Sequence, residues 1–136
     1  LSSDKPYRYA FTADADVTAE SVNIGHVLNQ TGAVTQVSLI ASLFERSGAG
    51  VTYLGGAFLQ SDFVAVSDSN GDLANVLLQL PIELQKGHQY EVELAVVEPD
   101  VYLRIAGAVS LNTGGEEQYL PDPVFMSSIR SLSRAW

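Results

Sequence analysis

The segment from Asp68 to Asp72 has the side-chain spacing that best suits a metal ion. Asp68, Asn70 and Asp72 alternate with Ser69 and Gly71, which directs three oxygen-bearing side chains to one side of a loop. Oxygen ligands in this arrangement are those that a hard cation such as Ca²⁺ prefers. The sequence therefore indicates a candidate calcium site at these three residues, and no other cofactor is expected.

The same segment has a second interpretation, which stays open at this point. An EF-hand loop carries glycine and glutamate at its sixth and twelfth positions, but here these positions are Leu73 and Gln79. The pair Asn70-Gly71 is a favoured sequence for a type I′ hairpin turn. In this interpretation the segment is a β-turn with its aspartates in water.

Three tyrosines, Tyr53, Tyr102 and Tyr119, are candidate contacts for a ligand such as a glycan. Aromatic rings commonly line ligand sites, and a few polar groups there fix the orientation of the ligand. Asn112 is the polar neighbour that we assign to this role. The alternative is ordinary packing, because one Trp and six Tyr are not a rich supply of aromatic residues.

The sequence contains no motif that indicates an enzyme. Nucleophilic catalysis needs a base beside a nucleophile and a third group that orients the base. The two imidazoles, His26 and His88, have no evident Ser or Cys partner, and no G-x-S-x-G segment occurs. Glu91 and Glu93 alternate along one predicted strand, so we interpret them as a solvated face and not as an acid and base pair.

The charge balance restricts the partners of the chain. Sixteen acidic and seven basic residues give a formal net charge of −9, which opposes attraction to nucleic acid and to anionic membrane surfaces. No apolar run of about 18 residues is present, so no membrane insertion is expected. No cysteine is present, which excludes disulfides. The chain starts without methionine or a signal-peptide pattern, and we expect a processed or excised product.

The clearest structural signal lies between Leu73 and Val97. Its second half alternates apolar and polar residues, which predicts a strand with one face in the core. The residues expected on that face are Tyr90, Val92, Leu94 and Val96. Before it, an alternation that starts at Val76 predicts a strand interrupted by Pro81.

Further strands are predicted wherever such alternation recurs between turn residues. They span residues 7–12, 22–28, 36–44, 51–54 and 58–66, and residues 101–109 as the hairpin partner of 90–96. Gly55-Gly56 is expected to end the strand 51–54, and Phe58 shares a face with Gln60 and Asp62, which leaves that register open. The strand 36–44 is apolar on both faces through Ile40 and Phe44, which is typical of a central or covered strand. Residues 1–6 are expected to be an unpaired lead-in and residues 111–117 a loop.

The end of the chain has a different pattern. Phe125, Ile129, Leu132 and Trp136 recur at the spacing of a helix face. We expect a short helix within a C-terminal extension, residues 123–136. Its apolar face either covers the chain's own core or docks on a neighbouring subunit.

Eight or nine short strands without a long helical pattern predict an all-β fold. We expect residues 1–136 to form a single domain, a two-sheet antiparallel β-sandwich with jelly-roll or Greek-key connections. A β-barrel is the alternative architecture.

One motif resembles a feature of known sandwiches. Leu84-x-x-Gly87-x-x-Tyr90-x-Val92 resembles the tyrosine corner of immunoglobulin-like domains, in which the Tyr hydroxyl bonds to the backbone a few residues upstream. Segments 37–44 and 81–97 together are similar to core strands of jelly-roll modules, such as the carbohydrate-binding modules of secreted bacterial proteins and phage fibres. The resemblance implies an architecture and carries no ligand residue.

Two functions are expected from these observations. The first is a non-catalytic extracellular module for binding or adhesion, with a glycan or a protein surface as its partner. The second is a structural subunit of a larger assembly, such as a phage fibre, a capsid decoration or a surface appendage, which makes mainly protein contacts and includes homo-oligomers. Both place the chain outside the cell, on a cell surface or in a virion.

Overall fold

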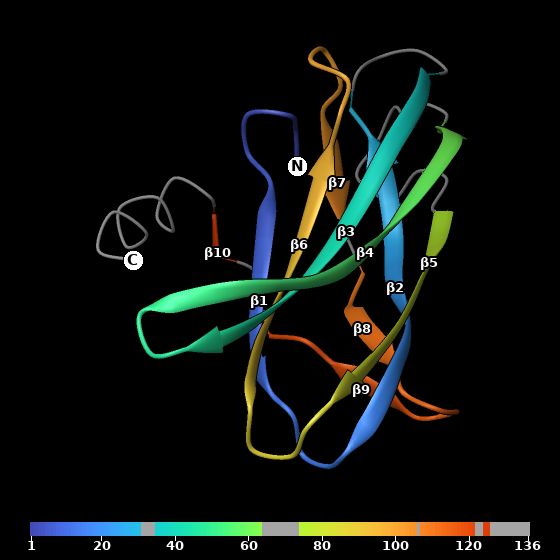
Figure 1. Ribbon diagram of the computed structural model, residues 1–136. Coiled ribbons are helices and arrows are strands. Elements are labelled where there is room, and N and C mark those ends of the chain that lie inside the picture. The colour runs from blue at the N-terminus through green and yellow to red at the C-terminus, as the bar shows by residue number, and fades with distance from the viewer. Residues whose placement is uncertain (31–34, 64–73, 106, 122–123, 126–136) are drawn as a thin grey trace.

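The computed structural model describes residues 1–30, 35–63, 74–105, 107–121 and 124–125. These residues form ten strands and no helix. The strands make two antiparallel sheets that pack as a β-sandwich (Figure 1), which confirms the predicted fold class. The described part of the chain has ten strands, where we expected eight or nine.

The two sheets draw their strands from the whole chain. The first sheet has the order β10-β1-β6-β3-β4 and consists of β1 (Tyr7–Thr12), β3 (Thr35–Ser47), β4 (Gly50–Phe63), β6 (Gln89–Val96) and β10 (Val124–Phe125). The second has the order β5-β2-β8-β9, with β7 also on β2, and consists of β2 (Val17–Asn29), β5 (Ala74–Leu84), β7 (Leu103–Ile105), β8 (Val109–Asn112) and β9 (Glu117–Tyr119).

The core lies between the sheets, where alternate residues of the long strands meet. The predicted inner face of β6 is confirmed, because its four apolar residues are all nearly inaccessible to solvent. The same is true of the inner face of β3, whose buried apolar residues are Val37, Leu39, Ala41 and Leu43. As its two apolar faces indicated, β3 is a central strand, with β6 on one side and β4 on the other.

The predicted bond of the tyrosine corner is present. The backbone N–H of Gln85 donates a hydrogen bond of 2.8 Å to the hydroxyl of Tyr90, which is 1% exposed. Gly87 has a φ of 83° in the turn between β5 and β6, a conformation that favours glycine. The phenol therefore fills the corner of the core and satisfies a backbone group of the turn.

The prediction that Gly55-Gly56 ends a strand was wrong. Both glycines lie inside the continuous strand β4, where they pair with Leu43 and Ser42, and Leu54 forms a bulge before them. Glycine is needed here because of close approach. A Cβ on Gly55 would lie 2.8 Å from a methyl carbon of Ile82, and one on Gly56 would lie 2.7 Å from a backbone oxygen.

The predicted hairpin of residues 90–96 with 101–109 was also wrong. After β6 the chain crosses to the second sheet, where β7 pairs with residues 27–29 of β2 and β8 pairs with residues 21–24. The expected loop at 111–117 contains the end of β8 and the start of β9. In addition, β5 continues through Pro81, which an edge strand tolerates because one side of its backbone has no ladder to break.

Residues 1–6 are not an unpaired lead-in. The amino group of Leu1 donates to the carbonyl of Leu103, and the N–H of Leu103 donates to the carbonyl of Leu1, each at 2.8 Å. Ser2 and Lys5 form an isolated β-bridge, and both Leu1 and Ser2 are buried. The start of the chain is thus held against β7.

Candidate functional site

The predicted ligand residues are exposed, but they do not converge on one site. Tyr53 lies on β4, Tyr102 in the connection between β6 and β7, and Tyr119 at the end of β9, and their exposed fractions are 60%, 55% and 64%. In Figure 1, β9 and the loop before β7 lie at opposite ends of the molecule. Only Asn112 and Tyr119 share an element, the hairpin of β8 and β9.

The hairpin of β8 and β9 borders a shallow groove. The groove has a volume of about 310 Å³, and its lining includes Asp14, Glu116 and Tyr119. The hydroxyl of Tyr119 donates a hydrogen bond of 2.8 Å to the carboxylate of Glu117, and this bond raises the pKa of Tyr119. The side-chain oxygen of Asn112 accepts a bond from a turn N–H, so it supports the hairpin.

A second groove lies on the other side of the β1–β2 turn. It has a volume of about 500 Å³ and is lined by Asp16, Glu83, Lys86 and His88, among others. Two of its polar side chains have partners within the chain: the carboxylate of Asp16 accepts the N–H of Lys86 at 2.7 Å, and His88 contacts Glu45 at 3.4 Å. The first bond links the β1–β2 turn to the β5–β6 turn, and the second links His88 to strand β3.

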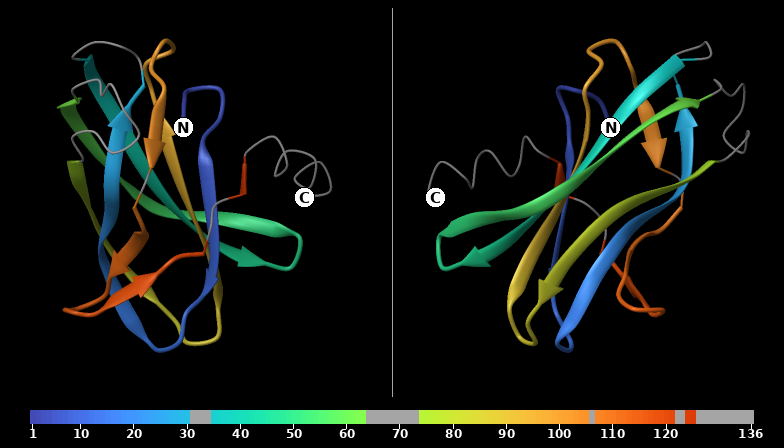
Figure 2. Two further views of the ribbon diagram at one scale, coloured as in Figure 1. Left: turned by 180° about the vertical axis from the view of Figure 1, so that it is seen from behind. Right: turned by 45° about the vertical axis from the view of Figure 1, so that its right-hand side comes forward.

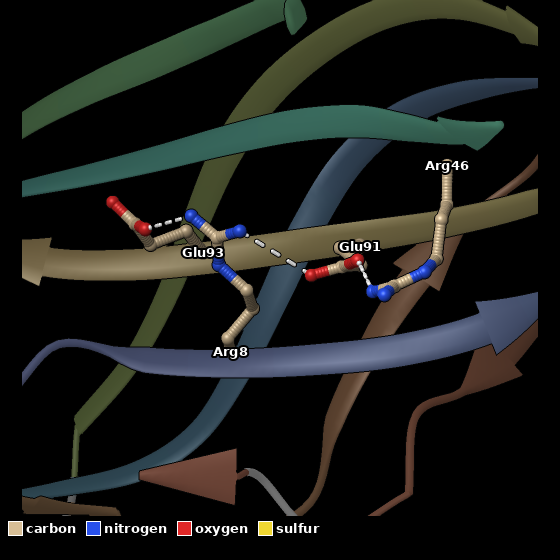
Figure 3. A network of polar contacts seen from close by, with 4 residues as sticks. All are labelled: Arg8, Arg46, Glu91 and Glu93. Atoms are coloured by element: carbon tan, nitrogen blue, oxygen red, sulfur yellow. Dashed lines mark hydrogen bonds and ion pairs between the residues drawn. The ribbon is translucent and has the colours of Figure 1, made fainter. Parts of the chain in front are cut away.

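A network of charged side chains lies on the outer face of the first sheet (Figure 3). Arg8 contacts Glu91 at 3.3 Å and Glu93 at 2.5 Å, and Arg46 contacts the other oxygen of Glu91 at 2.7 Å. The side chains of Arg8 and Glu91 are only 8% and 4% exposed. The expectation that Glu91 and Glu93 form a solvated face was therefore wrong.

The ladder of the sheet explains why these charges meet. Arg8 stands opposite Glu93 in the pairing of β1 with β6, and Arg46 lies near Glu91 in the pairing of β3 with β6. All four side chains point away from the core, so three strands contribute to one cluster. Buried charges are tolerated when they are paired in this way. Sequence alternation identified the face but not the partners, which depend on strand order.

Aromatic side chains extend this network across the same face. The guanidinium of Arg8 lies 4.8 Å from the centre of the Phe44 ring, a cation–π contact. The Phe44 ring in turn meets Tyr53 edge-on, with 5.7 Å between centroids. Contacts thus run from the buried ion pairs of β1 and β6 to an exposed ring on β4.

Strand β4 carries the largest group of exposed apolar side chains in the described part of the chain. Tyr53, Leu54 and Phe58 are 60%, 36% and 61% exposed. Phe58 pairs with Ile40 on the outer face, while Ala57 and Leu59 turn inward. The sequence left this register open. The small residue Ala57 and the apolar Leu59 were the available signal for the inner face, and Leu54 and Phe58 were missed as surface residues.

The remaining predicted sites fall mainly outside the described residues. The proposed calcium ligands Asp68, Asn70 and Asp72 lie there, as do Ile129, Leu132 and Trp136. Phe125, expected on the helix, instead lies in strand β10, where its backbone pairs with Tyr7. Local helical spacing did not anticipate this pairing, because β1 is distant in sequence.

Within the described ranges, no cluster of three or more His, Asp or Glu side chains is placed to hold a metal ion. None of the described residues belongs to a helix that could cross a membrane. Comparisons with family models, with curated proteins and with solved structures find no match to this chain.

Proposed function

We propose that this chain is a non-catalytic structural subunit, which joins a larger assembly through protein contacts on the outer face of its first sheet. The observation that carries this proposal is the composition of β4. From Gly50 to Ser61 the strand has no charged residue, although the chain has a net charge of −9. Three large apolar side chains are exposed there, at Tyr53, Leu54 and Phe58. An exposed apolar strand in a strongly charged protein is typical of a contact surface.

The ion-pair network supports this function by making the surface rigid. Arg8, Glu91 and Arg46 link β1, β6 and β3, and Phe44 connects that cluster with Tyr53. A surface that is already ordered loses less conformational entropy when it binds a partner. Such a subunit would suit a fibre, a capsid decoration or a surface appendage.

The proposal is tested by measuring mass in solution with size-exclusion chromatography and light scattering over a range of concentrations. We expect the wild type to form oligomers and the double variant Tyr53→Ser/Phe58→Ser to dissociate. The matched control is Tyr102→Ser/Tyr119→Ser, which removes two equally exposed tyrosines from other surfaces and should leave the mass unchanged. A wild type that stays monomeric at its highest soluble concentration would overturn the proposal.

A glycan-binding module is a second candidate, favoured by the groove beside Tyr119. An exposed ring next to carboxylate and amide groups offers a stacking surface with hydrogen-bond acceptors. On a glycan array, we expect any binding to be lost in Tyr119→Ala and kept in Tyr102→Ala. An array without hits for the wild type rejects this candidate.

A further inference from the structure

The described part of the chain ends at one edge of the first sheet, where β10 lies beside β1 (Figure 2). Phe125 is paired with Tyr7, and the ladder continues this row across the sheet to Leu94, Ala41 and Ala57. Because β10 runs antiparallel to β1, the chain heads from Phe125 toward the next row of the same sheet. Residues 126–136, which we call the C-terminal segment, therefore start beside that row.

This next row is apolar on the outer face of the sheet. Ala95 pairs with Ile40, and Ile40 pairs with Phe58. Ala95 and Ile40 are partly exposed, and Phe58 is 61% exposed. Apolar side chains that adjoin one another at the surface are typical of a site that another element or protein covers. We call these three residues the outer apolar row.

The C-terminal segment is long enough to cover the outer apolar row. Neighbouring strands are about 4.8 Å apart, so Ile40 of β3 and Phe58 of β4 lie about 14 and 19 Å from β10. The eleven residues of the segment span about 16 Å as a helix and about 36 Å when extended. The segment can thus reach Ile40 in the first form and pass Phe58 in the second.

The composition of the segment suits this surface. Ile129, Leu132 and Trp136 supply large apolar side chains, and Arg130 and Arg134 are its only charged side chains. The segment contributes +2 to the formal net charge of −9, so the rest of the chain carries −11. This charge difference attracts the segment to the body of its own chain.

The outer face is acidic around the outer apolar row. The ion-pair network on this face has two charges of each sign and is neutral as a whole. Glu98 and Asp62 are additional carboxylates. Glu98 accepts the hydroxyl of Ser38, two residues before Ile40, and Asp62 lies on the outer face of β4, four residues after Phe58. The two arginines of the segment complement this negative charge.

We propose that the C-terminal segment folds back over the outer face of its own first sheet and covers the outer apolar row. This inference rests on the proposed structural function and adds a regulation to it, because Phe58 belongs to the surface by which the subunit joins an assembly. The segment and a partner compete for Phe58, so a partner must displace the segment before the full surface is available. Tyr53 lies outside the row and stays exposed for the first contact with that partner.

Trp136 makes the docking measurable, because it is the only tryptophan in the chain. Its fluorescence is measured in dilute solution, where light scattering shows a monomer. We expect emission at shorter wavelength, and acrylamide quenching at least twofold weaker, than in a synthetic peptide of residues 126–136. Quenching equal to that of the peptide would overturn the docking. Shielding that appears only as the concentration rises would also overturn it, because the segment would then bind a second copy.

A variant of the sheet tests where the segment lies. Phe58→Ser removes the most exposed member of the outer apolar row, and we expect Trp136 to be quenched as readily as in the peptide. The matched control is Leu77→Ser, which changes an exposed apolar residue of the second sheet and should leave Trp136 shielded. Unchanged shielding in Phe58→Ser would place the segment elsewhere and overturn the proposal.

A variant of the segment tests the competition in the full-length chain. Ile129→Ser/Leu132→Ser weakens the apolar contacts of the segment and leaves the sheet unaltered. We expect it to form oligomers at concentrations at least tenfold lower than the wild type needs, whereas Ser128→Ala/Ser131→Ala should behave as the wild type. Oligomer formation that is unchanged or weaker in the first variant would overturn the competition.

The failure of this inference and the failure of the proposed function are distinguishable. If the wild type and the segment variant both stay monomeric while Trp136 is shielded, the structural function fails and the docking stands. If the wild type forms oligomers but Trp136 is as accessible as in the peptide, the docking fails and the structural function stands.

Discussion

The hydroxyl of Tyr90 is the single group whose removal we expect to affect stability most cleanly. The change Tyr90→Phe deletes one oxygen from a side chain that is 1% exposed. The ring remains, and with it the stacking on Phe11 at 5.7 Å and the contact with His88 at 6.5 Å. What is lost is the acceptor for the N–H of Gln85. The variant therefore isolates one hydrogen bond of the corner between β5 and β6.

The magnitude follows from leaving that N–H without its acceptor. An unsatisfied donor costs about 1 to 3 kcal/mol when it is buried. The bond to Tyr90 is only partly buried and Gln85 is an exposed residue, so the low end of this range applies. We expect a decrease of about 1 kcal/mol in the free energy of unfolding, which corresponds to a Tm lowered by about 3 to 4 °C for a chain of this size.

The assay is urea denaturation followed by far-ultraviolet circular dichroism, with the slope m compared between variants. Tyr53→Phe is the matched control, because it deletes the same oxygen from a side chain that is 60% exposed. Surface changes of this kind usually alter stability by less than about 0.5 kcal/mol. A Tyr90→Phe protein as stable as this control would refute the reasoning.

High pH offers an independent check on the same group. Burial raises the pKa of Tyr90 above 10.0, and this effect outweighs the opposing effect of the bond from Gln85. The folded chain therefore keeps a proton that the unfolded chain releases above pH 10, so stability must fall as the pH rises through that value. Tyr90→Phe removes this component of the decline, and an unchanged decline would contradict the assignment.

Three further predictions concern other parts of the sandwich. Glu91→Gln removes a charge that two guanidinium groups share, and we expect a loss of about 3 kcal/mol in urea denaturation. Glu98 accepts bonds from the N–H and hydroxyl of Ser38 at 2.7 and 2.8 Å; burial opposes ionisation, but these bonds prevail and lower its pKa below 4.5. The contribution of ionised Glu98 to the stability of the fold is therefore complete above pH 4.5 and is lost as the pH falls through the lowered pKa. In acid titrations, the stability of Glu98→Gln should depend less on pH than that of the wild type. Gly25→Ala would place a Cβ 2.8 Å from a backbone oxygen of Ala108, and we expect a loss of about 1 to 3 kcal/mol by thermal denaturation.

Matched controls separate these effects from general disturbance. Glu83→Gln alters an exposed carboxylate and should leave the urea midpoint unchanged. Gly50→Ala meets no atom closer than 3.9 Å, so its Tm should stay near that of the wild type. If a control loses as much stability as its partner variant, the corresponding contact is not the cause.

The alternation of apolar residues was sufficient to predict the inner faces of β3 and β6. In a half-buried strand, apolar residues that face the core alternate with polar residues that face solvent, so the sequence itself indicates which residues are buried. The bond of Tyr90 could also be predicted, because donor and acceptor lie five residues apart. These features depend on local sequence.

The features that were missed depend on distant neighbours. The burial of Glu91 requires Arg8 and Arg46, which become its neighbours only through the strand order β1-β6-β3. Gly55 has the local appearance of a turn residue, but it lies inside β4, and the close approach of Ile82 from the second sheet leaves no room for a side chain there. The exposure of Phe58 on β4 was not predicted, because the sequence left open which face of this strand is buried.

The position of β6 between β1 and β3 also has a consequence for the order in which the chain folds. β1 cannot join its sheet until β6 is available, some 80 residues later, whereas β3 and β4 are consecutive and can form a hairpin early. During synthesis, both edges of that hairpin remain unpaired until β6 has been synthesised and pairs with β3. Nascent chains are therefore expected to be most prone to aggregation between the synthesis of β4 and that of β6.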